Sequence, residues 1–182
     1  MQPETAFDVG LPDYAVHRLS PEDAGLLQRL LEQCLDFSLR VDGRPPAPNA
    51  AEEVFTSAPP GKSLADKLVF GTVNCQNDLV GCLDAMRRYP DDATWWIGLL
   101  LLAPEARSQG LGEKVLRAFV EVVRAGGGRA IMLGVVEDNQ QAYKFWARMG
   151  FELVRQTEPR QFGNKTQTVS VMRQSLEPNP IS

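Results

Sequence analysis

The sequence predicts a single domain of mixed α/β class, with helices packed around one β-sheet. Its 182 residues suit one compact domain. Hydrophobic residues make up 43% and charged residues 23%, the balance of an ordinary globular protein with one sizeable core. Segments with strand and helix patterns follow in the order β, α, α, three strands, α, β, α, β, β, which is typical of layered α/β proteins. We therefore treat residues 1–182 as one domain.

The first third of the chain predicts one strand and two helices. Residues 14–19 alternate between apolar and polar side chains, as in a half-buried strand. Residues 20–23 are of the types that begin helices, and apolar residues then recur at helical spacing as far as Arg40. The prolines of residues 42–49 predict a loop, and a shorter helix over 49–55 follows it.

The rest of the chain alternates between strands and helices. Residues 68–74 and 79–88 predict a hairpin closed by a turn at Asn77-Asp78. Residues 94–102 are apolar at nearly every position, which predicts a strand covered on both faces. The remaining predicted elements are a helix over 110–124, a strand over 129–136, a helix over 139–149, and strands over 151–155 and 166–172.

Charge and cysteine content argue against several classes of protein. A formal net charge of −4 gives no support to nucleic-acid binding through phosphate neutralisation. Cys34, Cys75 and Cys82 form no CxxC pair, and His17 is the single histidine, so we expect neither disulfides nor a metal site. The N-terminal residues lack the pattern of a signal peptide, and the longest apolar stretch, residues 97–103, is too short to span a membrane. We expect a cytoplasmic protein that does not bind membranes.

The most informative segment is a buried strand that runs through a loop into a helix, over residues 99–112. Gly110 and Gly112 would let backbone N–H groups approach a ligand closely, because no Cβ stands in the way. The positive end of a helix and its free N–H groups favour phosphate or pyrophosphate, and Arg107 could add a charge-assisted contact. The alternative is a tight strand-to-helix turn without a ligand.

Two motifs in this region resemble those of one family. Residues 107–112, Arg-Ser-Gln-Gly-Leu-Gly, match the (Arg/Gln)-x-x-Gly-x-(Gly/Ala) signature of the GCN5-related N-acetyltransferase (GNAT) family. The second motif, over 139–151, has Asn139, Ala142, an aromatic pair and a final Gly-Phe, as in the helix after the fifth strand of these enzymes. The resemblance implies a GNAT-like acyl-CoA N-acyltransferase fold, a mixed central sheet of about seven strands with helices on both faces.

The resemblance also implies acetyl-CoA as cofactor and a set of residues that bind it. Backbone N–H groups of the loop and helix start would hold the pyrophosphate together with Arg107. The end of the fourth strand would lie along the pantetheine, at a bulge where it splays from the fifth, and Asn139 would contact the cofactor from the other wall. The cofactor-binding residues expected are Leu100, Leu101, Leu102, Arg107, Ser108, Gln109, Gly110, Leu111, Gly112 and Asn139.

The reaction implied by the family is direct attack of an amine on the thioester, which makes the chain an acyltransferase, an N-acetyltransferase. The acceptor would be an amine of an unidentified small molecule, peptide or protein. A homodimer is also typical of the family. The alternative is a non-catalytic acetyl-CoA-binding sensor or scaffold module.

The expected general acid departs from the family pattern. The family often has a tyrosine at the position of Trp146, and an indole has no proton to give near neutral pH. Tyr143 lies three residues earlier, on roughly the same helical face, and is the candidate general acid. It is equally compatible with a packing role.

The general base is also open. Many family members carry a glutamate on the fifth strand, where this chain has Gly134. Asp84, on the third strand, is the candidate catalytic base, and Asp92 and His17 are further candidates. The alternative is that the amine arrives neutral and no protein base is needed. Glu137 and Asp138 at the end of the fifth strand read as turn residues.

An acceptor pocket could be lined by aromatic and basic residues near the cleft. Trp95 and Trp96, with Phe37, Arg40 and Arg44, are candidates, although the tryptophans fit core or edge packing as well. The loop over residues 40–48 lies where GNAT enzymes vary in acceptor specificity.

A dinucleotide-binding oxidoreductase is the main rival. Gly110 and Gly112 resemble the start of GxGxxG, but Val115 stands in place of the third glycine. Only one further βα unit follows, whereas a dinucleotide domain needs several.

Overall fold

The computed structural model describes residues 6–177, and within them one mixed sheet of eight strands in the order β1-β2-β3-β4-β5-β6-β10-β7. Neighbouring strands are antiparallel except β5 and β6, which are parallel. The strands of this sheet are β1 (Ala6–Phe7), β2 (Tyr14–Arg18), β3 (Lys67–Asn74), β4 (Leu79–Met86), β5 (Thr94–Leu102), β6 (Ala130–Val136), β7 (Glu152–Gln156) and β10 (Val169–Ser175). A separate hairpin consists of β8 (Arg160–Phe162) and β9 (Lys165–Gln167).

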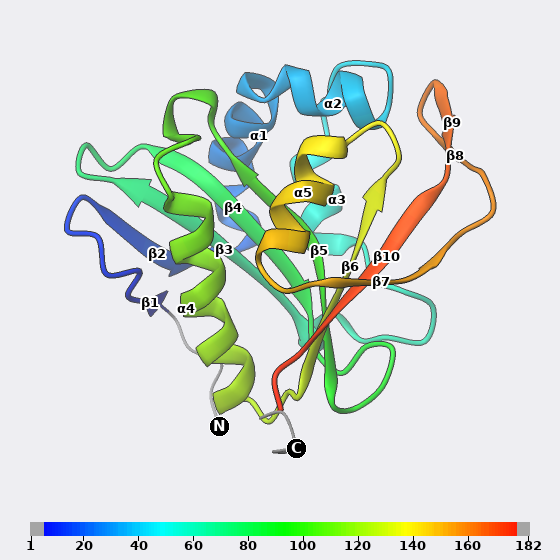
Figure 1. The fold of residues 1–182 in the computed structure, drawn as a ribbon. Helices are drawn as coiled ribbons and strands as arrows, with labels where there is room; N and C mark the ends of the chain where they lie inside the picture. Colours follow the sequence, from blue (N-terminus) through cyan, green and yellow to red (C-terminus); the bar gives the residue numbers. More distant parts are fainter. Residues whose placement is uncertain (1–5, 178–182) are drawn as a thin grey trace.

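Helices cover both faces of the sheet (Figure 1). The helices are α1 (Ala24–Gln33), α2 (Leu35–Val41), α3 (Ala50–Thr56), α4 (Leu111–Ala125) and α5 (Gln140–Arg148). α1 and α3 pack on each other and against β4 and β3, while α4 contacts β5 and β1 on the opposite face. In the described residues 6–177, no helix combines the length and apolar character needed to cross a bilayer.

An aromatic cluster fixes α4 on the sheet. Phe119 of α4 makes edge-to-face contacts with Phe70 of β3 and Trp95 of β5, with ring centroids 6.2 and 6.0 Å apart. Trp95 needs space at the end of α4, and glycines provide it. A Cβ on Gly126 or Gly128 would lie 2.5 or 2.9 Å from the indole, closer than side-chain atoms tolerate. The glycines that follow this helix therefore make room for the core.

The predicted mixed α/β fold is confirmed, with three differences in its elements. The sheet has eight strands rather than about seven, because the short β1 pairs with β2 and Phe7 packs on Phe70 at 5.1 Å. The helix predicted as far as Arg40 is broken at Cys34, which leaves the helical region with ψ 39°. β8 lies in a segment where no element was predicted, and the strand predicted over 166–172 is divided between the end of β9 and the start of β10.

The break at Cys34 has a tertiary cause. Its side chain is fully buried, and Sγ lies 3.4 Å from the carbonyl oxygen of Leu102 at the end of β5. No helix-breaking residue stands nearby in the sequence, so local propensity alone continues the helix. The change of direction carries α2 across the end of the sheet, where it becomes one wall of the site described below.

Candidate functional site

The site lies where β5 and β6 stop pairing. The parallel register joins Thr94–Ile97 of β5 to residues 130–133 of β6 and ends there. At the same height, the β4–β5 ladder shifts so that Asp84 faces Leu99 while Ala85 faces Ile97, which leaves Gly98 as the extra residue of a β-bulge. A bulge bends its strand, and the second half of β5 diverges from β6. The prediction of a strand covered on both faces holds for the first half of β5 only, since Gly98 is exposed and Leu99 and Leu100 are partly exposed.

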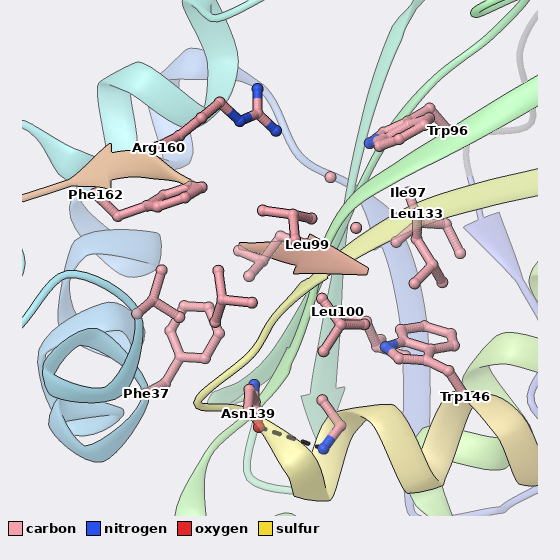
Figure 2. A pocket seen from close by; sticks show the side chains of 17 residues that line it. Phe37, Trp96, Ile97, Leu99, Leu100, Leu133, Asn139, Trp146, Arg160 and Phe162 are labelled. Atoms are coloured by element: carbon pink, nitrogen blue, oxygen red, sulfur yellow. Dashed lines mark hydrogen bonds between the residues drawn. The ribbon is translucent and has the colours of Figure 1, made fainter. Parts of the chain in front are cut away.

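The divergence opens a cavity of about 280 Å³. Figure 2 shows its walls: β5 and β6 pass through the centre, α2 and the β8–β9 hairpin lie on one side, and α5 lies below. The lining residues are Phe37, Val41, Trp96, Ile97, Gly98, Leu99, Leu100, Leu133, Gly134, Val135, Val136, Asn139, Ala142, Trp146, Arg160, Phe162 and Val169. The cavity is therefore mostly apolar, with few polar groups.

The backbone of β5 presents free polar groups to this opening. The N–H of Ala103 donates to Val80 on β4 at 2.8 Å, so the alternation of an antiparallel ladder turns Leu101 towards β4 as well. Leu100 and Leu102 then direct their backbone groups to the opposite edge, which β6 has left. The carbonyl of Leu102 is already engaged, because it accepts from Arg107 Nε at 2.8 Å. Of the three predicted leucines, Leu100 thus has the most accessible backbone groups.

The loop into α4 forms a cradle of backbone donors. Ser108 and Gly110 have positive φ values of 62° and 79°, which fold the chain sharply just before the helix. Within the part of the chain that the structure describes, no protein group accepts from the backbone N–H groups of residues 108–113. Free N–H groups and the positive end of a fifteen-residue helix make a site suited to an anion. The cradle contains the predicted Ser108, Gln109, Gly110, Leu111 and Gly112.

Arg107 is engaged by other groups of the protein. Its guanidinium makes two hydrogen bonds to the carboxylate of Asp36 on α2, at 2.7 and 3.1 Å. The hydrogen bonds from Arg107 hold the pKa of Asp36 below its usual range, while burial raises the pKa of the neighbouring Cys34 thiol. Arg107 thus joins α2 to the end of β5 and to the loop, a structural role that the motif alone did not indicate.

α5 contributes a wall with one polar residue. Asn139 caps this helix, its Oδ1 accepting from the N–H of Ala142 at 3.3 Å and from Arg40 at 3.2 Å. Its amide nitrogen points into the cavity (Figure 2). Trp146 lines the cavity beside Leu100, at the position where the family often has a tyrosine. Tyr143 is half-buried against the core and is not among the lining residues.

Asp84 lies directly under the bulge. Its Oδ2 occupies the place of the missing Gly98 side chain, 2.6 Å from where a Cβ would be. Oδ1 is fully buried, 2.8 Å from the ammonium of Lys67, and the two side chains are 13% and 8% exposed. Burial raises the pKa of Asp84, and the attraction of Lys67 only partly opposes this. Since Gly98 lines the cavity, the carboxylate lies behind its floor.

The other candidate acids and the histidine lie away from the cavity or are engaged. His17 is exposed on β2, three strands from β5, and Asp92 is exposed before the start of β5. Glu137 accepts from the hydroxyl of Thr168, and Asp138 pairs with Lys165 at 2.6 Å. Among residues 6–177, no three metal-ligating side chains gather closely enough to hold a metal ion.

Successive side chains of β5 point to opposite faces of the sheet, so the predicted acceptor residues Trp95 and Trp96 do not lie together. Trp95 faces the core, whereas its neighbour Trp96 lines the cavity opposite Phe37 of α2 (Figure 2). Arg40 contributes hydrogen bonds rather than a lining surface, and Arg44 is likewise absent from the lining. The fold therefore brings together Phe37 and Trp96 from the predicted set.

Sequence reasoning missed the contribution of the β8–β9 hairpin. Arg160 and Phe162 line the cavity although they lie about sixty residues beyond β5 in the sequence. The signal was present: Gly163-Asn164 is a two-residue turn with glycine first, typical of hairpins, between short segments that pair in register. Nothing in that signal shows against which part of the molecule the hairpin packs.

Comparison with known proteins identifies the family. A profile described as the acetyltransferase (GNAT) family matches residues 27–151, which is more than half of the chain. The chain therefore belongs to the GNAT acetyltransferase family. In sequence it is 34% identical over 56 residues to N-alpha-acetyltransferase 30 of Schizosaccharomyces pombe. That match spans 31% of this chain and 37% of the relative, so the similarity to this protein is local.

Solved acetyltransferases share the fold across most of the chain. An acetyltransferase from Thermus thermophilus is 24% identical with a TM-score of 0.68, covering 87% of this chain and 96% of that one. A GNAT-family protein from Desulfovibrio desulfuricans is 19% identical with the same TM-score, covering 90% and 99%. The yncA protein of Salmonella typhimurium, solved with its cofactor acetyl-CoA, is 15% identical with a TM-score of 0.66, covering 93% and 97%. At these identities the likeness establishes the fold.

The buried pair under the bulge leads to a prediction on stability. We expect Lys67→Met to lower the free energy of unfolding by about 3 kcal/mol, because Asp84 would be left buried with no charged partner. Adding Asp84→Asn should restore much of that loss, so the double variant should be more stable than the Lys67→Met single variant. Chemical denaturation of the wild type, both single variants and the double variant measures this coupling. Purely additive losses would show that the two side chains do not act as a pair.

The same comparison has a pH signature. Because the folded-state pKa of Asp84 is raised, the native state keeps its proton at pH values where the unfolded chain has lost it. The contribution of Asp84 to the free energy of unfolding therefore falls as the pH rises from the ordinary carboxyl pKa through the raised pKa. The double variant should lack this part of the pH dependence of stability.

Proposed function

We propose that this protein is an acetyl-CoA-dependent N-acetyltransferase that acetylates an amine. The observation that supports this most directly is that the second half of β5 leads from the cavity beside β6 to the donor cradle at residues 108–113. The thioester supplies an activated acetyl group: a C–N bond forms to the amine, the C–S bond breaks, and one proton leaves the nitrogen while one reaches the sulfur. The protein has to hold the thioester beside the amine and move these two protons.

The cofactor site follows from the free backbone groups. The N–H groups of residues 108–113 would hold the pyrophosphate, and the backbone edge of Leu100 and Leu102 would bind the pantetheine chain. Asn139 would contact it from the α5 wall. Arg107 would support the cradle through Asp36 and contribute charge from behind it. The relative solved with acetyl-CoA has the same fold, which is consistent with this placement.

Gly112 allows a test of the cradle. A Cβ there would lie 3.6 Å from Leu102 and 3.7 Å from Phe145, so the fold accepts a side chain. We expect Gly112→Glu to bind acetyl-CoA at least about ten-fold more weakly than Gly112→Gln, because only the glutamate repels the pyrophosphate. Glutamate in a first helical turn does not destabilise the helix. Calorimetric titration with acetyl-CoA, with NADH and ATP as control ligands, measures the difference.

Wild-type protein that fails to bind acetyl-CoA would refute the proposed function. Equal affinities of the two Gly112 variants would be compatible with acetyl-CoA binding but would show that the pyrophosphate does not bind at the start of α4.

Asp84 is the proposed general base, acting through a water molecule beside Gly98. Its carboxylate lies behind the cavity floor, and its raised pKa brings it closer to the pH at which a base must work. We expect Asp84→Asn to lower kcat by about 100-fold near neutral pH. The deficit should shrink as pH rises towards the pKa of the acceptor, because a neutral amine needs no base. A deficit that stays constant with pH would indicate a structural role, as would a weaker affinity for acetyl-CoA.

Tyr143 is the proposed general acid for the departing sulfur. It lies on α5 next to Ala142, which lines the cavity. We expect Tyr143→Phe to reduce kcat by about 100-fold while acetyl-CoA affinity stays unchanged. Unchanged turnover would exclude the residue as the acid.

The second candidate function is a non-catalytic acetyl-CoA sensor or scaffold, and Trp146 is the observation that favours it. An indole at the wall of the cavity cannot protonate a thiolate. Acetyl-CoA binding without acetylation of any amine in a broad panel would select this function.

We further propose a cytoplasmic location and a homodimer. The free cysteines Cys34, Cys75 and Cys82 suit a reducing compartment, which cell fractionation tests. β7 is an edge strand with Leu153 and Val154 about half exposed, at 48% and 52%, and offers an apolar edge for self-association. A monomeric mass in light scattering would exclude the dimer.

A further inference from the structure

The cavity has a single charged side chain in its lining, Arg160 of β8. Figure 2 shows its guanidinium extending over the mouth of the cavity, between Phe162 and Trp96. It lies 6.0 Å from the centroid of the Phe162 ring, so its stem rests on an apolar surface. Within residues 6–177, no carboxylate pairs with this guanidinium. Its five N–H donors are therefore free for a planar anion.

Aromatic and aliphatic side chains surround the rest of this half of the cavity. Phe37 of α2 and Phe162 of β8 lie on one side of the cavity and Trp96 lies on the other (Figure 2), and Val41 of α2 also lines it. The whole cavity measures about 280 Å³, just below the range of roughly 300–1,000 Å³ that is usual for small-molecule sites. Part of that space would hold the acetyl thioester. The remainder suits a small molecule with an apolar body.

The hairpin that carries Arg160 is fixed in place by buried hydrogen bonds. Gln167 of β9 is 2% exposed and donates to the carbonyls of Arg40 and Val41, at 3.1 and 2.6 Å. Lys165 of β9 donates to Asp138 at 2.6 Å and to the Arg40 carbonyl at 3.2 Å. These contacts join the hairpin to both α2 and the end of β6. Arg160 and Phe162 are thus presented on a rigid support, which lowers the cost of ordering them around a ligand.

We propose that the acceptor is a small amino acid-like amine, with a carboxylate bound by Arg160 and an apolar side chain held between Phe37, Trp96 and Phe162. This assignment rests on the proposed acetyltransferase function and specifies its substrate class. The amine lies towards Leu99 and Leu100, where β5 diverges, and the apolar group fills the side lined by α2 and the hairpin.

The charge of the lining disfavours two other acceptor classes. Polyamines and similar polycations need carboxylates for their remaining ammonium groups, and the described lining contains none. The nearest buried acid, Asp84, is already paired with Lys67. The N-terminus of a protein lacks a carboxylate next to its amine, so it would make no ion pair with the exposed guanidinium of Arg160.

The first experiment compares four acceptors that share the isobutyl group of leucine with one linear diamine. Acetylation of L-leucine, L-leucinamide, 3-methylbutylamine, a leucyl-glycyl-glycine amide peptide and 1,5-diaminopentane is followed with acetyl-CoA. Each kcat/KM is calculated from the concentration of unprotonated amine, because these amines lose their protons at different pH values. We expect kcat/KM for L-leucine to exceed that for each of the others by at least about ten-fold, the usual value of one charge-assisted pair.

The second experiment tests Arg160 itself. Arg160→Gln should lower kcat/KM for L-leucine at least about ten-fold, mainly through KM, while the value for 3-methylbutylamine stays unchanged. Arg155→Gln is the matched control, since Arg155 is an exposed arginine on β7 outside the cavity. Binding of N-acetyl-L-leucine, measured by calorimetry, should weaken in the Arg160 variant and not in the control. Thermal melting checks that both variants remain folded.

The possible failures are distinguishable. Acetyl-CoA binding with equal rates for leucine and its carboxylate-free analogues overturns the amino acid assignment and leaves the acetyltransferase function standing. The same holds if the peptide or the diamine is the better acceptor. If acetyl-CoA binds and no member of the panel is acetylated, the amino acid assignment is overturned, and the broader amine panel then decides between an acetyltransferase and a sensor. Absence of acetyl-CoA binding removes the proposed function, and the acceptor assignment with it.

Discussion

The arrangement of this protein depends on the point where β5 and β6 separate. Four residue pairs hold the strands in parallel, and the Gly98 bulge then bends β5 away. Backbone groups that would have formed a continuous ladder become free polar groups at the edge of a cavity. The bulge also requires a glycine, because the Asp84 carboxylate occupies the place of a side chain there. One irregularity therefore creates the opening, frees donors within it and places an acid behind its floor.

Two sets of tertiary contacts hold the walls of this opening. On one side, Arg107 connects Asp36 of α2 with the Leu102 carbonyl, so the cradle and α2 are fixed together. On the other side, the buried Gln167 connects the β8–β9 hairpin with the end of α2. α2 is therefore common to both sets of contacts. Its orientation derives from the break at Cys34, whose sulfur lies against the same Leu102 carbonyl.

The likeness to known acetyltransferases extends over most of the chain, and the structure adds contacts within the site that the motif does not contain. The family motif predicted the family and the fold, and both predictions are confirmed. The motif also indicated Arg107 as a pyrophosphate ligand, yet the guanidinium is engaged by Asp36 and Leu102. A motif records which residues recur near a ligand. It does not distinguish a side chain that touches the ligand from one that supports the loop.

The sequence by itself determined the elements and the donor cradle, because hydrophobic periodicity and glycine placement act over a few residues. Residues 94–102, the loop to Gly112 and the helix after Asn139 all form where they were predicted. Tertiary structure alone decided which of Trp95 and Trp96 faces the cavity, why the helix breaks at Cys34, and that Arg160 lies over the site. Each of these depends on contacts between residues far apart in the chain, such as Cys34 with Leu102 and Gln167 with Arg40. Local sequence patterns do not predict such contacts, because side-chain packing and buried hydrogen bonds form only when the elements meet.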